Sequence, residues 1–226
     1  MHSKRRYHFV KFNDTDIVNV VIAGTAGQGV ITLKRLIEFA AQRTGAERIL
    51  GAEHHGLAQR EGAITSHTRY QRKLSENERK NIQSPLISYG DADLYICMEP
   101  VEALRQGIFA SKKTTFTLNS HTIPGVMITA ALEEYPSLKR IEEILMKYSE
   151  EVYFLNATEL SLNYFNSNQY INIMMLGFAI ITEKLPFIEI KFYEEVIKQW
   201  LRDPDKNIKA LHIGIEEGKR IIKTLK

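Results

Sequence analysis

Apolar residues recur along the chain with two different periods, and these periods predict where strands and helices lie. Residues 17–23 form a β-branched run that ends at Gly24, a pattern typical of a strand buried on both faces of a parallel sheet. From Val30 to Ala41 the apolar positions recur at helical spacing, and Gly45 follows as a stop signal. The pattern therefore predicts a strand, a glycine-rich turn and an amphipathic helix.

Shorter runs of the same two kinds continue along the chain. Further strands are predicted at residues 49–52, 63–70, 92–98, 114–118 and 152–155, and helices at 101–108, 137–148, 170–184, 191–202 and 209–225. This order predicts an α/β fold: a doubly wound, mostly parallel sheet with helices on both faces and a helical C-terminal part. No repeat or long linker divides the chain, so we expect an N-terminal tail at residues 1–16 and a single domain at residues 17–226.

The composition narrows the class of protein. The 226 residues are 44% hydrophobic and 25% charged, and the formal net charge is +3. A charge this small over the whole chain argues against a nucleic-acid-binding protein. The longest stretch free of polar side chains, residues 173–181, is far shorter than the roughly 20 residues of a membrane-spanning helix. The first residues also lack the apolar segment of a secretory signal, so we expect a cytoplasmic protein that binds neither nucleic acid nor a membrane.

The cysteine count limits the redox chemistry that the chain can carry. Cys97 is the only cysteine, which excludes an intramolecular disulfide. A [4Fe–4S] cluster usually takes four thiolates, so a cluster held by this chain alone would lack three of them. We therefore expect no metal or cluster site on this chain.

A glycine-rich turn follows the first predicted strand and runs directly into the first helix. Its residues are Gly24, Thr25, Ala26, Gly27, Gln28 and Gly29. Such a turn points several backbone N–H groups at one spot, and the helix N-terminus adds about half a positive charge, so a phosphate or carboxylate is the expected ligand. The alternative is a tight strand-to-helix turn that needs glycine only for its backbone geometry.

A nicotinamide dinucleotide is a further alternative for the same turn. Ala26 stands where dinucleotide-binding turns have the second glycine, which lets the pyrophosphate approach the backbone. Glu53, near the end of the second predicted strand, is positioned in the sequence as a ribose-binding acid. The extra methyl group of Ala26 argues against this ligand without excluding it.

A second group of polar residues lies at 53–62 and continues on the next strand with Ser66 and His67. Neighbouring side chains on a strand point to opposite faces, so His54 and His55 are not expected to bind one metal ion together. His55 is suited to donate a hydrogen bond or to transfer a proton, and Arg60 to hold a carboxylate or phosphate in bidentate fashion. The alternative is a buried polar network in which Glu53 accepts from Arg60.

Taken together, these motifs resemble the gamma-type small subunit of the 2-oxoacid:ferredoxin oxidoreductases. The resemblance is carried by residues 19–30, Glu53, 55–60, 66–69, 84–87, 92–94, 99–105, Asn119, 123–124 and 172–177. It departs from the family pattern at Ala26 and Glu61, where the family usually has glycine, and at Leu57, where it usually has methionine.

The resemblance implies a reaction and a division of labour between subunits. Enzymes of this family convert a 2-oxoacid, coenzyme A and oxidised ferredoxin to an acyl-CoA, carbon dioxide and reduced ferredoxin. They use thiamine diphosphate and [4Fe–4S] clusters, which are expected on a large partner subunit and not on this chain. The expected substrate is indolepyruvate or another aryl 2-oxoacid, and this chain would complete the active-site cleft of its partner.

The resemblance and the residue patterns together give a set of site residues. His55 and Arg60 are the candidates for a catalytic role. Candidate ligand-binding residues are Gly24, Thr25, Gly27, Gln28, Gly29, Glu53, Gln59, Ser66 and His67. Two alternatives stay open at this point: a stand-alone nucleotide- or anion-binding regulatory module that uses the same turn, and a homo-oligomer of the isolated chain.

Overall fold

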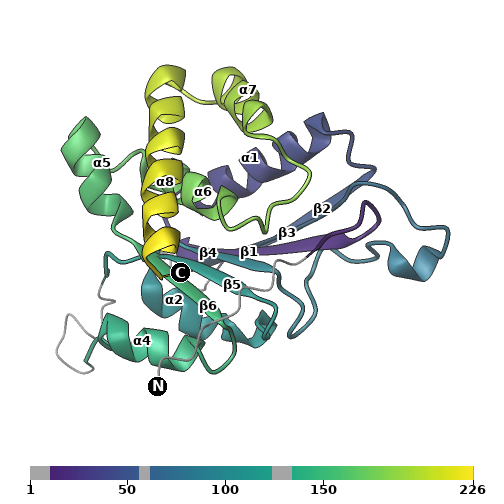
Figure 1. Cartoon of the computed structure of the whole chain (residues 1–226), viewed down its shortest axis with the longest axis horizontal. Helices are drawn as coiled ribbons and strands as arrows, with labels where there is room; N and C mark the ends of the chain where they lie inside the picture. Colours follow the sequence, from purple (N-terminus) through teal and green to yellow (C-terminus); the bar gives the residue numbers. More distant parts are fainter. Residues whose placement is uncertain (1–10, 56–61, 124–133, 226) are drawn as a thin grey trace.

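The computed structural model in Figure 1 describes residues 11–55, 62–123 and 134–225 of the chain. Within these residues, six strands form one sheet in the order β2-β3-β1-β4-β5-β6. The strands are β1 (Ile17–Thr25), β2 (Arg48–His55), β3 (Ala63–Gln71), β4 (Leu94–Cys97), β5 (Thr115–Asn119) and β6 (Glu151–Leu155).

The sheet is mostly parallel, as the sequence predicts. Strands β1, β4, β5 and β6 pair in parallel, whereas β3 runs antiparallel to both β1 and β2. A parallel pair needs a crossover of a dozen or more residues, and only residues 56–62 separate β2 from β3. This short connection accounts for the one reversed strand.

Helices cover both faces of the sheet, as Figure 1 shows. On the upper face lie α1 (Val30–Arg43), α6 (Ile171–Ile180), α7 (Ile190–Trp200) and α8 (Pro204–Leu225), and on the lower face α2 (Pro100–Arg105) and α4 (Leu138–Leu145). Two hydrophobic cores result, one on each side of the sheet. The predicted fold class is therefore confirmed, including the helical C-terminal part.

Helix α6 is apolar on all sides because it lies between the sheet and α8. Gly214 of α8 faces the backbone of α6 so closely that an added Cβ would collide with the carbonyl group of Met174. Gly177 of α6 meets the backbone of α8 at Leu211 in the same way. The two helices are thus held in contact backbone to backbone.

The helices depart from the sequence prediction in two places. Helix α5 (Ala157–Phe165) was not predicted, and the predicted helix at 101–108 is the shorter α2 followed by a 3-10 turn, η2 (Gly107–Phe109). Trp200 is 58% exposed because it ends α7 and stacks on Phe39 at the surface. No helix in the described part of the chain is long and apolar enough to cross a membrane.

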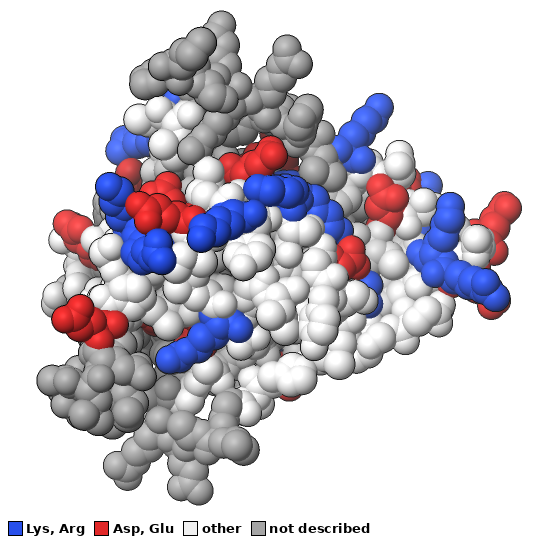
Figure 2. Space-filling model, turned by 90° about the horizontal axis from the view of Figure 1, so that it is seen from below, with Lys and Arg blue, Asp and Glu red and all other residues white. Residues whose placement is uncertain are grey.

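The lower face of the molecule carries charges of both signs. Figure 2 shows Lys and Arg side chains interspersed with Asp and Glu, and a broad uncharged area beside them. At the right-hand end of this view lies the loop between β3 and β4, which contains the 3-10 turn η1 (Glu78–Lys80). Opposite charges this close together do not form a field of one sign on this face.

Candidate functional site

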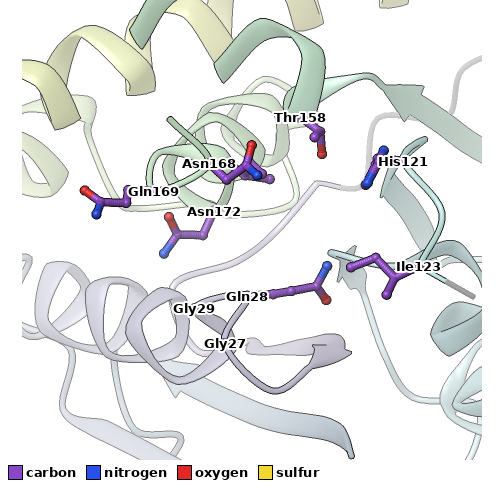
Figure 3. Close-up of a pocket in the computed structure, with 10 residues that line it drawn as sticks. Gly27, Gln28, Gly29, His121, Ile123, Thr158, Asn168, Gln169 and Asn172 are labelled. Carbon is purple, nitrogen blue, oxygen red and sulfur yellow. The ribbon is translucent and has the colours of Figure 1, made fainter. Parts of the chain in front are cut away.

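A pocket of about 230 Å³ lies at the carboxyl ends of the parallel strands. In Figure 3 the glycine-rich turn forms one side, the beginning of α6 a second, and the segment after β5 a third. The lining residues are Gly27, Gln28, Gly29, His121, Ile123, Thr158, Asn168, Gln169, Ile171 and Asn172. None of these residues carries a carboxylate, and α/β sheets bind ligands at this edge.

The conformation of the glycine-rich turn is fixed by Gln28. The Oε1 atom of Gln28 accepts from the backbone N–H of Thr25 at 2.7 Å, and its Nε2 atom donates to the carbonyl oxygen of Met98 at 3.1 Å. Gly27 and Gly29 have φ angles of 88° and 77°, in the left-handed region that favours glycine. Both glycines are therefore required by the backbone path of the turn.

Several donors of the turn remain free for a ligand. Among the described residues, the N–H groups of Gly27 and Gly29 donate no hydrogen bond. Helix α1 begins after Gly29 with no side-chain cap and no acidic residue in its first turn. Uncapped N–H groups and the positive end of the helix dipole favour an anion here.

Two buried polar side chains form the opposite side of the pocket. Asn172, which is 8% exposed, packs against Gly29, and its Nδ2 atom finds no acceptor in the described part of the chain. Thr158, 6% exposed, accepts from Asn119 at 3.0 Å through its hydroxyl oxygen, which leaves the hydroxyl hydrogen to be donated. The pocket is thus lined by donors from the glycine-rich turn, from α5 and from α6.

The third side of the pocket is held by Glu99. Its Oε2 atom caps α2 by accepting from the N–H groups of Val101 and Glu102, at 2.8 and 3.1 Å. Its Oε1 atom accepts from the N–H of Ile123 at 3.4 Å and from the hydroxyl of Tyr135. Because Ile123 lines the pocket, this buried carboxylate positions the wall that follows β5.

Glu53 and His55 lie at the same sheet edge but outside this pocket. Both side chains point toward α1, where Glu53 forms an ion pair with Lys34 at 3.3 Å and lies 3.7 Å from the His55 imidazole. Lys34 also pairs with Glu38 at 3.3 Å, and burial raises the pKa of Glu38. Glu53 is therefore paired with a helix lysine, a partner that the sequence did not reveal.

His54 and His55 point to opposite faces of the sheet, as predicted. The His54 ring lies 5.8 Å from the ring of His67 on the lower face. His67 is almost fully buried and accepts from the N–H of Ile87 at 3.1 Å through Nδ1. Burial, helped by the charges of His54 and Arg69, lowers the pKa of His67 to about 4, so this imidazole is neutral at pH 7.

The structure brings only some of the residues predicted from sequence to this pocket. Gly27, Gln28 and Gly29 line the pocket, and Gly24 and Thr25 form the end of β1 beside it. Ser66 and His67 are buried further along β3 and are not brought to the pocket. The residues Gln59 and Arg60 lie outside the described residues.

A comparison with known protein families decides the family. The family model of pyruvate ferredoxin/flavodoxin oxidoreductases matches residues 19–217. The chain belongs to this family. The match spans the whole described sheet except the first two residues of β1, and it extends into α8.

Individual relatives agree with this assignment. An indolepyruvate oxidoreductase subunit IorB from Archaeoglobus fulgidus is 34% identical over 203 residues, covering 89% of this chain and 95% of that protein. A protein of the same name from Pyrococcus horikoshii is 28% identical over 90% of this chain and 97% of its own length. The resemblance to this family that the sequence motifs indicated is therefore confirmed.

Solved structures show the same fold. The gamma subunit of a keto/oxoacid ferredoxin oxidoreductase from Geobacter sulfurreducens matches with a TM-score of 0.61 at 15% identity, covering 90% of this chain and 99% of that chain. A 2-oxoglutarate:ferredoxin oxidoreductase from Magnetococcus marinus matches with a TM-score of 0.59 at 17% identity. That match covers 93% of this chain but 32% of the other, so the fold forms about a third of a longer polypeptide there.

The fold of this family member also bears on the dinucleotide alternative. In a dinucleotide-binding fold the strand that ends in the ribose-binding acid lies directly beside the first strand. Here β3 lies between β1 and β2, and Glu53 is paired with Lys34. This strand order argues against Glu53 as a ribose-binding residue for the turn.

Of the pocket residues in the described chain, only those of the glycine-rich turn were predicted as site residues; among the polar ones that were missed are His121, Thr158 and Asn172. Each lies just after a strand end or at a helix start, at a large distance in sequence from the glycine-rich turn. The one available signal is Asn172, a polar residue directly before the longest apolar run of the chain. In the described residues, no group of three or more His, Cys, Asp or Glu side chains could hold a metal ion.

Proposed function

We propose that this chain is the small subunit of a thiamine-diphosphate-dependent 2-oxoacid:ferredoxin oxidoreductase that acts on indolepyruvate or another aryl 2-oxoacid. The enzyme would join the 2-oxoacid, coenzyme A and oxidised ferredoxin to give an acyl-CoA, carbon dioxide and reduced ferredoxin. The observation that carries this proposal is the near full-length match to proteins named indolepyruvate oxidoreductase subunit IorB.

In this proposal the large partner subunit holds thiamine diphosphate and the [4Fe–4S] clusters. Cys97 is fully buried in β4, and burial raises the pKa of its thiol, an effect to which the charges of Glu102 and Glu99 add. A thiolate is the form that ligates iron, so this environment disfavours the single cysteine as a ligand. The chemistry that thiamine diphosphate and the clusters supply would then take place on the partner.

The pocket at the glycine-rich turn is proposed to hold an anionic group, either a phosphate of coenzyme A or the carboxylate of the 2-oxoacid. Three features support this role: unused N–H donors at Gly27 and Gly29, the buried amide of Asn172, and a lining without carboxylates. His55 and Arg60, at or just beyond the carboxyl end of β2, are proposed to contact substrate from the same edge.

Reconstitution tests the proposed function. The purified chain alone is expected to be colourless and to oxidise no 2-oxoacid. Mixed with the large subunit, it should restore reduction of ferredoxin that depends on both the 2-oxoacid and coenzyme A. An iron-containing, active chain in isolation would contradict the proposal, and so would a large subunit whose coenzyme-A-dependent rate is the same without this chain.

The anion site is tested separately on the isolated chain. Inorganic phosphate or coenzyme A, titrated and followed by NMR, should shift the amide signals of Gly27 and Gly29. Asn172→Leu removes the buried donor at similar volume and should weaken the binding, whereas Asn13→Leu, at an exposed position in the turn before β1, serves as the matched control because Asn13 does not line the pocket. Equal binding by all three proteins would show that the pocket is not the anion site.

A further inference from the structure

A second cavity, about 550 Å³ in volume, opens on the lower face near the loop between β3 and β4. We refer to it as the Arg69 groove. Its lining residues are Ile17, Arg69, Arg79, Asn81, Gln83, Ser84, Leu86, Ile87, Ser88 and Tyr89. The groove lies on the opposite face of the sheet from α1 and shares no residue with the glycine-rich pocket.

Arg69 forms the floor of this groove and is only 8% exposed. Its Nε atom donates to Asn19 at 2.8 Å, and its Nη1 atom donates to the carbonyl oxygens of Ser84 and Leu86 at 2.9 and 3.0 Å. Its Nη2 atom finds no acceptor in residues 11–55, 62–123 and 134–225. One edge of a buried guanidinium is therefore left without a partner where it lines the groove.

No carboxylate in the described chain pairs directly with this guanidinium. Asp91 and Asp93 are the nearest acids, and Asn19 lies between them and Arg69. Both acids form ion pairs with Lys113, at 2.8 and 3.0 Å. Burial lowers the pKa of Arg69, but an arginine side chain stays charged in proteins. The groove thus has a buried positive charge at its floor.

The walls of the groove combine a second cation with exposed apolar surface. Arg79 of η1 adds a guanidinium, and the lining includes no Asp or Glu. Tyr89 is 78% exposed and Leu86 is 44% exposed. The exposed Ile108 lies next to this segment, because the backbone N–H of Gly90 donates to its carbonyl oxygen. Figure 2 shows that the broad uncharged area of this face lies beside the charged end that holds η1.

We propose that the Arg69 groove docks a segment of the large partner subunit that carries a carboxylate among apolar residues. The carboxylate would lie between Arg69 and Arg79, and the apolar side chains would cover Leu86 and Tyr89. This inference rests on the proposed function, because it takes the large subunit as the occupant. The two guanidinium groups of the lining, with no Asp or Glu among its described residues, call for a carboxylate in the occupant. Tyrosine and arginine are also enriched among the residues that dominate binding energy in protein interfaces.

A small free anion would use only part of this surface. The groove is open to solvent, and exposed apolar groups such as Tyr89 and Ile108 gain nothing from a hydrophilic ion. A protein segment uses both parts, because burial of the apolar groups and pairing of the carboxylate occur together. In the Magnetococcus enzyme the same fold is part of a longer chain, which agrees with a permanent neighbour for this domain.

The test is a charge reversal in η1, measured on the complex with the large subunit. Arg79→Glu should weaken binding to the large subunit at least tenfold and reduce its dependence on salt, because a repulsive charge then faces the docked carboxylate. Lys80→Glu is the matched control, since Lys80 is the next residue of the same exposed turn and does not line the groove. Tyr89→Ser should also weaken binding, through the apolar contact alone.

At saturating concentrations of the small subunit, the Arg79→Glu complex should turn over like the wild type, because the groove acts in docking. Equal affinities for the Arg79→Glu, Lys80→Glu and wild-type chains would overturn the inference while leaving the proposed function intact. Failure of the wild-type chain to bind the large subunit would instead overturn both.

Two other occupants of the Arg69 groove, a second copy of this chain and a free anion, are tested on the isolated chain. Self-association that Arg79→Glu abolishes, seen by sedimentation, would assign the groove to a second copy and overturn the inference. Inorganic phosphate that shifts the NMR signals around Arg79, together with unchanged affinity for the large subunit, would assign it to a free anion with the same consequence.

Discussion

The side-chain amide of Gln28 donates to the main-chain carbonyl of Met98, 3.1 Å away, and thereby joins the turn after β1 to the end of β4. The other end of the same amide accepts from the N–H of Thr25 at 2.7 Å. One side chain thus fixes the path of the turn before any ligand arrives. The pocket is therefore preorganised, because the turn does not have to lose conformational freedom when its N–H donors bind.

Gln28→Ala is expected to lower the free energy of unfolding by about 1–3 kcal/mol, because it removes both hydrogen bonds and leaves the N–H of Thr25 without its acceptor. Urea unfolding of the isolated chain followed by circular dichroism measures this loss. Gln42→Ala, at an exposed position of α1, should change stability by less than about 0.5 kcal/mol. A loss of the same size in both variants would contradict the role given to Gln28.

Alanine substitutions at three glycines with positive φ distinguish the cost of backbone strain from the cost of a steric collision. Gly27, Gly29 and Gly45 have φ angles of 88°, 77° and 78°. An alanine at Gly27 or Gly45 meets open space, so each should cost about 1–2 kcal/mol for the left-handed backbone alone. Gly29→Ala should cost clearly more, because its Cβ would collide with the amide of Asn172. Thermal unfolding of the three variants ranks them, and equal losses would contradict the close contact with Asn172.

His67 should make the protein less stable in mild acid. Its pKa is about 4 in the folded chain and about 6.5 when exposed, so the unfolded state binds more protons between these values. The stability contribution is complete above pH 6.5 and falls as the pH decreases, by about 2 kcal/mol at pH 5. The measurement is the difference in unfolding free energy between wild type and His67→Gln from pH 7 to pH 5.

That difference should shrink by about 2 kcal/mol over this range, because only the wild type takes up a proton at position 67 on unfolding. His121→Gln, at an exposed position, is the control and should follow the wild-type pH dependence. A constant difference between wild type and His67→Gln would mean that the buried imidazole titrates normally.

Lys113→Met tests the ion pairs at the amino end of the sheet. Asp93 is nearly buried, and burial raises the pKa of its carboxyl while Lys113 opposes this rise. Without Lys113 the carboxylate lacks its direct cation, so the variant should lose about 1–3 kcal/mol at pH 7. The exposed neighbour Lys112, changed to Met, should have little effect.

The loss of unfolding free energy caused by Lys113→Met should become smaller as the pH is lowered. A carboxyl whose folded pKa is raised favours the folded state below its unfolded pKa and loses that contribution as the pH rises through its folded pKa. The gap between Lys113→Met and the wild type should therefore narrow from pH 7 to pH 4.5, in urea titrations at each pH. A gap that stays constant would show that Asp93 does not respond to Lys113.

Most of the fold could be predicted from local patterns, because β1 is a continuous β-branched run and α1, α7 and α8 have apolar stripes of period 3.6. The reversed direction of β3 was not predicted, because the second strand was predicted to end at residue 52, whereas β2 continues to His55 and leaves only residues 56–62 as the connection. Helix α5 was missed because its apolar residues do not form a clear stripe, as the exposed Leu162 and Tyr164 show.

The glycine-rich turn was found from sequence because its signal is local. The partner of Glu53 was not, since Lys34 reaches it from a helix that precedes β2 in the chain. Asn172 and Thr158 were missed for the same reason: each enters the pocket through tertiary packing of a helix that looks unrelated to the turn. Whether Arg60 joins them stays a prediction, because that residue lies outside the described ones.

The backbone contact between α6 and α8 determines when, during synthesis, the pocket at the glycine-rich turn is completed. The glycine-rich turn leaves the ribosome early, but Asn172 is supplied by α6, whose position is set by Gly177 and Gly214 against α8. At about 5–20 residues per second, these helices are synthesised on the order of ten seconds after the turn. A nascent chain therefore exposes the turn long before the helices that complete the pocket around it have been made.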